Sequence, residues 1–312
     1  MGIFGWIRRR RAPGAGSGGA GVIAEAQGEF SPAMMIAGRM RTVGVPYDLP
    51  RDTEEINRLD FQHYMLRYAF QGLYAAPIGQ PASILDVGTG TGRWALEMAR
   101  LFPRARVVGL DINPPPADQR ADQGVDVRPP NYSFVAANVL EGLPFAADSF
   151  DFTHQRLLFA AIPADRWPFV VDELARVTRP GGWVELVEMS SVADGGPNIE
   201  MLADWLRRLT ARRGVDVDAA EHVGDYLGAA PLKDVDIRVV NIPLGARGGR
   251  LGAMFAADFL SACRGFGGIA VQLGLTTQDE FDRTLDAARV DLNSSAYKCY
   301  APFSIAVGQK TA

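Results

Sequence analysis

Three glycines in the stretch ILDVGTGTGRW alternate with threonines, between an apolar run and an amphipathic one. Glycine has no side chain and tolerates left-handed backbone, so such a loop lets the backbone approach a ligand closely. Gly88, Gly90 and Gly92 give the spacing GxGxG, and Arg93 stands where the dinucleotide pattern GxGxxG needs its third glycine. The phosphate-cradling pattern GxxxxGK[ST] is absent as well. The loop therefore predicts a ligand held close to the backbone, without the signatures of a pyrophosphate.

Polar side chains stand at the ends of the apolar runs around this loop. Asp86 precedes the first glycine by two residues, and a carboxylate there would attract a cationic amine. Asp111 ends the next run, VVGLD, where an acid can accept both hydroxyls of a ribose. Asn138 follows a third run, FVAA, and its amide could bind an adenine edge or simply form a turn. An amine, a ribose and an adenine with no phosphate between them describe S-adenosylmethionine, which we predict as the cofactor.

The same segments carry a family resemblance. ILDVGTGTGRWALEMA, VVGLDINP and PGGWVELVE resemble the class I S-adenosylmethionine-dependent methyltransferases of the ubiquinone/menaquinone-biosynthesis type. EEINRLDFQHYMLRYAF, RPPNYSF and FDFTHQRLL are similar to fungal and bacterial methyltransferases of secondary metabolism. The resemblance covers residues 45 to 190 and departs at 113–131, a proline-rich loop where many relatives have a short helix. It implies a methyltransferase with a small-molecule acceptor.

The resemblance also implies roles for single residues. Asp86 would anchor the methionine amine, although it could instead cap the amides of its own loop. Thr89 could donate to the methionine carboxylate or only stabilise the turn. The residues that we expect at the cofactor are Asp86, Gly88, Thr89, Gly90, Gly92, Asp111, Ile112, Asn138, Val139, His154 and Gln155.

The segment FTHQR follows a fourth apolar run, at the sheet edge where ligands bind in such folds. His154 could be a general base for a phenol or an activated carbon acid. We favour the other interpretation, a histidine that hydrogen-bonds the backbone and shapes the pocket. Arg156 could bind a carboxylate of the cofactor or a partner within the fold.

Beside Arg156, three more residues are candidates for the acceptor side or the lid: Tyr47, Tyr64 and Glu188. Tyr47 and Tyr64 belong to the segment that folds over the cofactor in similar enzymes. Glu185 and Glu188 lie on opposite faces of one strand because side chains alternate. We expect one of these acids to pair with an arginine and Glu188, nearer the strand end, to face the site.

The hydrophobic pattern predicts an α/β fold, a Rossmann-like doubly wound sheet of seven strands. Five short apolar runs, 83–87, 105–110, 132–136, 150–153 and 183–187, read as buried strands with helical patterns between several of them. Two later strands, KDVDIRVVNIPLG and CYAPFSIAVGQK, enclose helices near 251–266 and 278–292. These helices, with another near 198–213, are expected to form a substrate cap inserted before the last strand.

Four regions follow from this pattern. Residues 1–29 form a flexible basic and glycine-rich leader, and 30–80 an N-terminal helical lid. Asp52 with Glu55 predicts a capping box at the start of the lid helix, and Gly72 its stop. Residues 81–195 form the cofactor-binding core, and 196–312 its last strands with the helical cap.

Composition limits the remaining choices. The chain has 312 residues, a net charge of −4 and an arginine run at Arg8–Arg11. That basic leader could be a weak electrostatic membrane tether, but no apolar run approaches the roughly 20 residues of a spanning helix. Two cysteines and three scattered histidines predict no metal site. We expect a cytoplasmic protein that does not bind nucleic acid, and its oligomeric state stays open.

Of all the functional features, the methyl acceptor is the one that the sequence determines least. The apolar, glycine-containing segment GGRLGAMFAADFLSACRGFGGIAVQLGL favours a hydrophobic substrate such as a quinone, polyketide or terpenoid. A regulatory protein that binds S-adenosylmethionine with little or no turnover is the alternative. A nucleic-acid or protein methyltransferase is disfavoured by the acidic body and by THQR in the place of an NPPY-like tetrapeptide.

Overall fold

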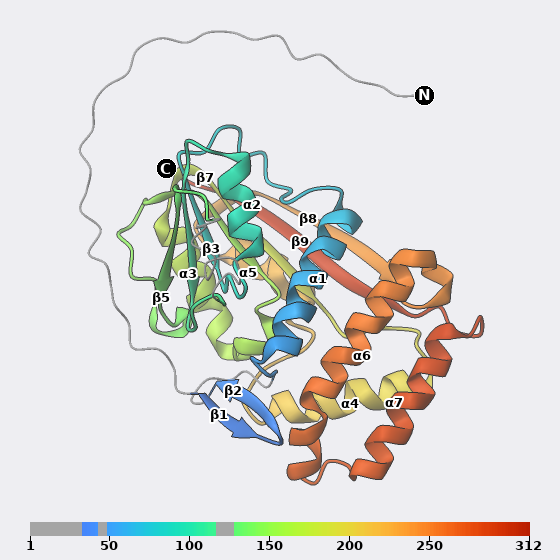
Figure 1. Cartoon of the computed structure of the whole chain (residues 1–312). Helices are drawn as coiled ribbons and strands as arrows, with labels where there is room; N and C mark the ends of the chain where they lie inside the picture. Colours follow the sequence, from blue (N-terminus) through green and yellow to red (C-terminus); the bar gives the residue numbers. More distant parts are fainter. Residues whose placement is uncertain (1–32, 43–48, 117–127) are drawn as a thin grey trace, which may run out of the picture.

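The computed structural model describes residues 33–42, 49–116 and 128–312, and its centre is a sheet of seven strands (Figure 1). The strand order is β5-β4-β3-β6-β7-β9-β8, with β9 antiparallel to both of its neighbours and the other pairs parallel. This arrangement confirms the predicted Rossmann-like sheet. The strands are β3 Ser83–Val87, β4 Arg106–Asp111, β5 Tyr132–Ala136, β6 Phe150–Arg156, β7 Thr178–Met189, β8 Leu232–Pro243 and β9 Tyr300–Lys310.

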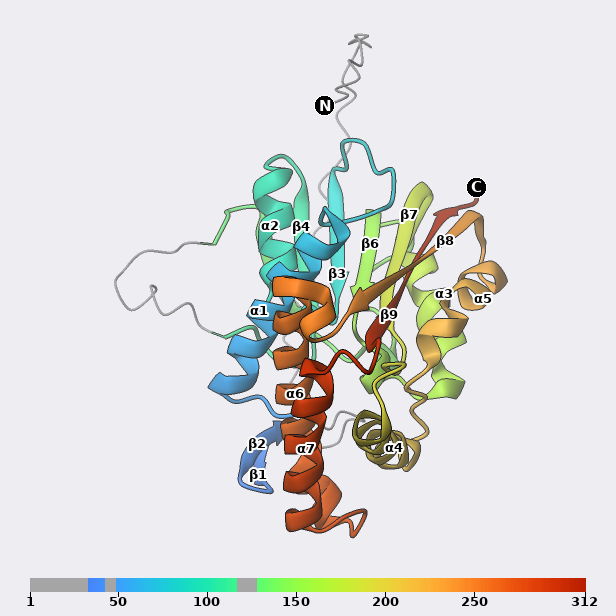
Figure 2. The same ribbon diagram turned by 90° about the vertical axis from the view of Figure 1, so that its right-hand side faces the viewer.

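Helices cover both faces of this sheet (Figure 2). The bounds are α1 Thr53–Phe70, α2 Arg93–Leu101, α3 Trp167–Val177, α4 Pro197–Ala211, α5 Val223–Ala229, α6 Gly249–Gln272 and α7 Gln278–Asn293. Helix α2 packs on β3 and β4 at one face, and α3 and α5 pack on the other. Helices α4, α6 and α7 contact one another and form a layer beyond the sheet, against which α1 also packs.

The alternation of side chains along β3 explains why the strand is apolar throughout. Ile84 packs into the core under α2, together with Trp94. Leu85 and Val87 point the other way, into the core under α3. A strand buried on both faces has no polar period, as the sequence predicted. A third core joins α1, α4, α6 and α7 to the ends of β7, β8 and β9.

Helix α1 begins as predicted and ends one residue earlier than predicted. Asp52 caps it by accepting a hydrogen bond from the Glu55 amide at 3.1 Å. The Glu55 side chain does not complete the capping box, because both of its oxygens accept from Arg58. The stop is Gln71, one residue before the predicted Gly72, and it takes the left-handed conformation (φ 59°).

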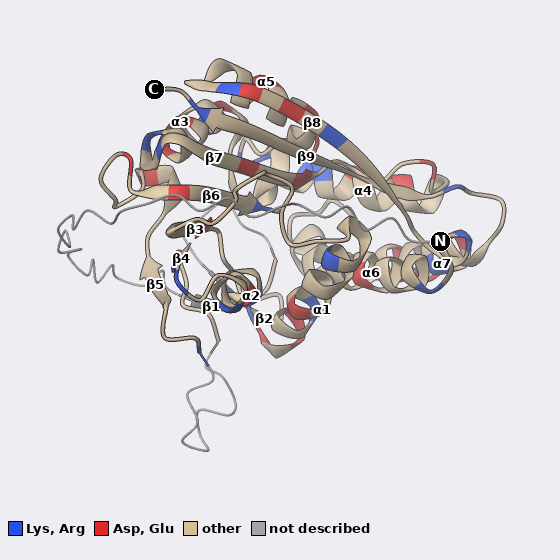
Figure 3. Ribbon diagram, turned by 90° about the horizontal axis from the view of Figure 1, so that it is seen from above, with Lys and Arg blue, Asp and Glu red and all other residues tan. Residues whose placement is uncertain are grey.

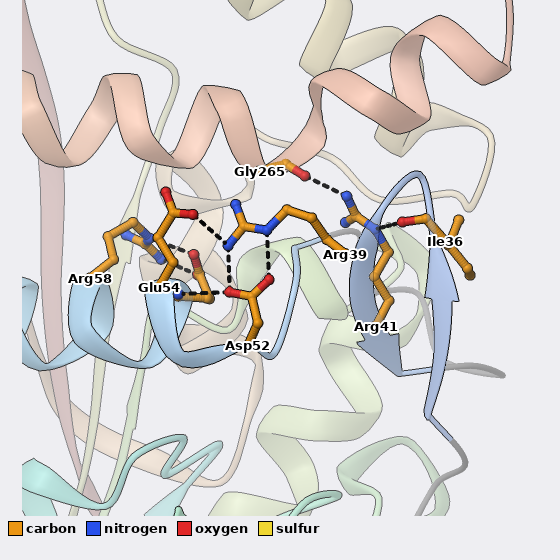
Figure 4. Close-up of polar contacts among 8 residues, drawn as sticks. Ile36, Arg39, Arg41, Asp52, Glu54, Arg58 and Gly265 are labelled. Atoms are coloured by element: carbon orange, nitrogen blue, oxygen red, sulfur yellow. Dashed lines mark hydrogen bonds and ion pairs between the residues drawn. The ribbon is translucent and has the colours of Figure 1, made fainter.

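A two-stranded hairpin, β1 Ala33–Ile36 and β2 Arg39–Thr42, precedes α1 and had no counterpart in the prediction. Figure 4 shows how its arginines connect it to two helices. Arg39 makes two hydrogen bonds to the Asp52 carboxylate at 2.6 and 2.5 Å. Arg41 is buried and donates to the carbonyl oxygen of Gly265 on α6 at 2.5 Å. The hairpin thus joins the start of α1 to α6.

Two further expectations are corrected. The segment Ala246–Gln272 has a mean hydropathy of 1.2 and is long and apolar enough to cross a membrane, although none was expected to be. Because more than half of this apolar stretch (56%) is buried inside the protein, it also fits the description of a core helix. Strand β6 continues to Arg156 instead of ending at Thr153, so the segment FTHQR lies within the strand. The leader 1–29, Tyr47 and residues 117–127 of the proline-rich loop lie outside the described residues.

Strand β8 is the edge of the sheet, since it pairs only with β9. Its outer part carries acidic and basic residues side by side, which Figure 3 shows as red and blue segments along the ribbon. A bulge between Lys233 and Asp236 breaks the register. Mixed charges and bulges are devices that protect exposed edges from pairing with another strand.

Candidate functional site

The glycine loop between β3 and α2 is left-handed at each glycine, with φ of 69° at Gly88, 53° at Gly90 and 76° at Gly92. The amides of Gly88 and Thr89 donate to the carbonyl oxygen of Leu110, which holds the loop on β4. A Cβ added at Gly88 would lie 2.7 Å from Leu158, so packing explains that glycine. A Cβ added at Gly90 would meet no atom within 4 Å. Gly90 therefore faces open space, as a ligand-binding position should.

Gly109, in the middle of β4, is a contributor that sequence reasoning missed. A Cβ there would lie 2.9 Å from the Tyr132 hydroxyl and 3.0 Å from the Thr89 side chain. The glycine lets the loop lie flat against β4. The signal in the sequence was a glycine inside the buried strand pattern VVGLD, which marks a close approach of backbone.

A cavity of about 270 Å³ lies at the carboxyl ends of β3, β4 and β6. Residues from the segment after β5 and from α1 also form part of its wall. Ten of the predicted site residues line it: Asp86, Gly88, Thr89, Gly90, Asp111, Ile112, Asn138, Val139, His154 and Arg156. Four described candidates do not, namely Gly92, Gln155, Tyr64 and Glu188. Parallel strands bring their carboxyl ends to one edge, which is why residues far apart in sequence meet here.

Asp111 fixes the loop at one end of the cavity. Its Oδ2 accepts from the Gly90 amide and its Oδ1 from the Asn113 amide, both at 3.0 Å. Burial raises the pKa of Asp111, and these two hydrogen bonds oppose the rise. A carboxylate oxygen has two lone pairs, so each oxygen can still accept one more hydrogen bond.

Asn138 caps the short 3-10 turn Val139–Glu141 beside Asp111's end of the cavity. Its Oδ1 accepts from the Leu140 amide at 3.1 Å, and its Nδ2 donates to Glu141 at 2.9 Å. The turn-forming interpretation of this asparagine is therefore correct. Because Asn138 and Val139 also line the cavity, the same turn forms its wall.

Asp86 and His154 form a buried pair on neighbouring strands. Asp86 accepts from the Thr89 hydroxyl at 2.6 Å through Oδ2 and from His154 Nδ1 at 2.9 Å through Oδ1. The His154 ring stacks on Trp94 with centroids 3.7 Å apart and planes 3° apart. Its Nε2 is buried and has no hydrogen-bond partner among the described residues. A neutral imidazole that donates from Nδ1 to Asp86 would carry its lone pair on Nε2.

Arg156 lies two residues further along β6 and contacts α1. Its Nη2 donates to His63 Nδ1 at 3.0 Å, and His63 Nε2 lies 3.4 Å from a Glu97 oxygen. Burial and, next, the Arg156 charge lower the pKa of His63 to about 3, so this imidazole is neutral. His63, Gln62 and Trp94 all line the cavity. Sequence reasoning had treated His63 only as a scattered histidine.

The prediction for Glu188 is wrong. Its side chain is fully buried away from the cavity and accepts from Gln155 Nε2 and from the amides of Leu158 and Phe159. Burial raises its pKa to about 7. Glu185 on the other face accepts from the amides of Ala75 and Ala76. In the described part of the chain neither acid forms an ion pair with an arginine, contrary to expectation.

Gln155 and Tyr64 also lie elsewhere than predicted. Gln155 belongs to the face of β6 opposite to His154, where it binds Glu188. Tyr64 is half exposed and makes an edge-on contact with the His63 ring at 5.1 Å. Its hydroxyl-bearing ring is thus on the outer side of α1.

Residues 84–182 match the family model described as a methyltransferase domain. "Methyltransferase str2" of Strobilurus tenacellus is 32% identical over 281 residues, which cover 83% of this chain and 94% of that protein. The chain belongs to the class I S-adenosylmethionine-dependent methyltransferases. Another relative is "N-methyltransferase sirN" of Leptosphaeria maculans, 32% identical over 67% of this chain and 74% of its own. "Secondary metabolism regulator laeA" of Aspergillus flavus is 32% identical over 64% of this chain and 54% of its own.

S-adenosylmethionine is the cofactor of this methyltransferase family, and the cavity fits it. A Cβ added at Gly90 would meet no protein atom within 4 Å, so the backbone there is open to a ligand. Asp111 lies at the end of β4 in the position of a ribose-binding acid. Gly90 and Asp111 thus line one part of the cavity, and His154 and Arg156 line another.

Proposed function

We propose that this protein transfers a methyl group from S-adenosylmethionine to a small, largely hydrophobic acceptor of secondary metabolism. The observation that carries the proposal is one cavity whose lining differs chemically between its two ends. Gly90, Asp111 and Asn138 line one end, and α1 with His154 and Arg156 lines the other. The names of the relatives, one an N-methyltransferase and another tied to secondary metabolism, support the same function.

We assign the first end to the nucleoside. Asp111 would accept the ribose hydroxyls with the lone pairs that Gly90 and Asn113 leave unused. Ile112 and Val139 would contact the adenine, and Asn138 would offer the edge of its amide. Asp86 would receive the methionine amine on the carboxylate that Thr89 and His154 already orient.

The second end would hold the acceptor. Ile56 and Leu59 from α1 and Leu157 and Leu158 after β6 give this part of the wall an apolar character. Apolar walls with a few polar groups are typical of sites for small organic molecules. They support a hydrophobic acceptor, such as a quinone, a polyketide or a terpenoid, over a charged polymer.

The chain's own residues would contribute alignment and proton transfer. S-adenosylmethionine supplies a methyl group on a sulfonium sulfur, a leaving group that needs no further activation. Positioning by the cavity wall can supply an effective molarity on the order of 10⁵ M. His154 Nε2 would accept the proton that a hydroxyl or N–H acceptor loses, while Asp86 holds Nδ1 and stabilises the imidazolium. A base of this kind is needed only where the acceptor must lose a proton.

Calorimetry tests the cofactor assignment. Wild-type protein should bind S-adenosylhomocysteine at one site. Asp111→Ala should weaken that binding at least tenfold, because the hydrogen bonds from the two ribose hydroxyls to the charged carboxylate are lost. Asp279→Ala, on the first turn of α7, is the matched control and should bind like wild type. Full affinity in Asp111→Ala would refute the ribose assignment.

A regulator that binds the cofactor without turnover is the second candidate, and the relative named as a regulator of secondary metabolism favours it. The discriminating measurement is accumulation of S-adenosylhomocysteine when protein, S-adenosylmethionine and a cell extract are combined. An enzyme accumulates the product in proportion to protein, and a pure binding protein gives none above the extract alone.

A further inference from the structure

Arg156 is a cation in the cavity wall that, within the described part of the chain, hydrogen-bonds a single, uncharged side chain. Its guanidinium binds His63 Nδ1, and burial keeps that imidazole uncharged. Among the described residues, no carboxylate lies within 4.0 Å of its nitrogen atoms. The side chain is only partly exposed. A guanidinium that is partly removed from water is usually paired with a carboxylate, because burying an unpaired charge is costly.

The acids near Arg156 are occupied elsewhere. Asp86 is bonded to Thr89 and His154, and Glu97 to Arg67. Glu185 and Glu188 accept from backbone amides. The described residues therefore supply no close counter-ion, although four carboxylates surround the guanidinium at longer range.

The neighbour of Arg156 on the same strand face is His154. Residues two apart on a strand point to the same side, about 7 Å apart along the chain. Both side chains line the cavity. Arg156 brings N–H donors and a positive charge to this wall, and the buried Nε2 of His154 has no hydrogen-bond partner among the described residues. The two groups are complementary to a ligand that carries an anionic oxygen and, a few bonds away, a proton to donate.

We propose that the acceptor is a carboxylic acid with a neighbouring hydroxyl or N–H group, whose carboxylate is bound by Arg156 while its protic group faces His154. The proposal rests on the proposed function, since it takes the α1 end of the cavity as the acceptor site. It narrows the acceptor from hydrophobic molecules in general to hydrophobic acids.

The direction of the Arg156 side chain favours the acceptor over the cofactor as the source of the carboxylate. Its Nη2 reaches His63 on α1, and α1 also supplies Ile56 and Leu59 to the apolar end. Asp111, which holds the Gly90 amide, lies at the end of β4, two strands away from β6. The methionine carboxylate remains the competing source, and the experiment below separates the two.

The test uses protein saturated with S-adenosylhomocysteine and two fluorinated probes followed by ¹⁹F NMR. 5-Fluorosalicylate carries a carboxylate beside a hydroxyl, and 5-fluorosalicylamide is its uncharged counterpart. Wild-type protein should bind the acid at least tenfold more tightly than the amide. Arg156→Gln should weaken the binding of the acid at least tenfold, because the charge-assisted contact is lost. The affinities for the amide and for S-adenosylhomocysteine should change by less than about twofold.

Arg93→Gln is the matched control, since Arg93 lines the same cavity but its guanidinium is held by Asp60 at 2.6 Å. It removes one positive charge as well and should keep the preference for the acid. Arg156→Lys retains the charge without the planar guanidinium and should keep a reduced preference for the acid over the amide. This variant replaces Arg156→Gln in the test if Arg156→Gln does not fold.

Three results would overturn the proposal: equal binding of acid and amide by wild type, unchanged acid binding by Arg156→Gln, or loss of S-adenosylhomocysteine affinity in that variant. The last result would assign Arg156 to the methionine carboxylate. Failure of the wild type to bind S-adenosylhomocysteine at all would instead refute the proposed function, so the two failures are distinguishable.

Discussion

Replacing Gly90 by alanine separates the cofactor role of the loop from its folding role. Gly90 is left-handed (φ 53°) and a Cβ there would meet no atom within 4 Å. Gly274, in the turn between α6 and α7, has the same two properties, with φ of 68° and nothing within 4 Å. Gly274 does not line the cavity, so the pair differ in what lies in front of the added methyl group.

The two alanine variants should lose similar stability. An L-residue in left-handed backbone costs about 1–2 kcal/mol, and the stiffer unfolded chain of an alanine variant returns about 0.4–1 kcal/mol. A net destabilisation of about 1 kcal/mol is therefore expected for each, measured by urea unfolding. Steric clashes should add nothing to this loss of stability, because a Cβ at either position meets no atom within 4 Å.

Binding should distinguish the two variants. The Gly90→Ala methyl group would occupy cavity space beside the backbone, so calorimetry should show S-adenosylhomocysteine binding at least tenfold weaker than in wild type. Gly274→Ala should bind like wild type. The reasoning is refuted if Gly90→Ala keeps full affinity, or if both variants lose affinity equally.

Two further predictions concern stability. Burial raises the pKa of Glu188 from 4.5 to about 7, so the native state keeps a proton that the unfolded chain loses, and stability falls as pH rises from about 5 to about 8. That fall, about 3 kcal/mol at 1.36 kcal/mol per pKa unit, should be smaller in Glu188→Gln, and identical pH profiles of urea unfolding would contradict it. Asp258→Ala should cost about 3 kcal/mol, because buried Arg58 on α1 then loses its 2.9 Å partner on α6. Asp258→Asn should cost less, and equal melting temperatures of wild type and Asp258→Ala would rule out a stabilising role.

The cofactor end of the site was predictable because its signal is local. Asp86, Asp111 and Asn138 each follow an apolar run that reads as a buried strand, and parallel strands place such positions at one edge. The glycine spacing and the strand ends therefore suffice to bring these residues together. The same reasoning places the strands themselves, with β6 and β7 longer than their apolar centres.

The acceptor end was less predictable because its contacts are long-range. His63 and Arg156 are 93 residues apart and meet only because α1 packs across the strand ends. The alternation of side chains along a strand correctly predicted that Glu185 and Glu188 face opposite sides of the sheet. It could not predict which of the two sides holds the cavity. The hairpin before α1 was missed because its short strands are held by arginine contacts to Asp52 and Gly265, which leave no hydrophobic pattern.

The most direct test of the central claim is a crystal structure of the protein grown with S-adenosylhomocysteine. Our account predicts the ribose hydroxyls on the Asp111 carboxylate, the backbone of Gly90 in contact with the ligand, and the sulfur directed toward the end formed by His154 and Arg156. A ligand bound outside this cavity, or one whose ribose does not reach Asp111, would contradict the account.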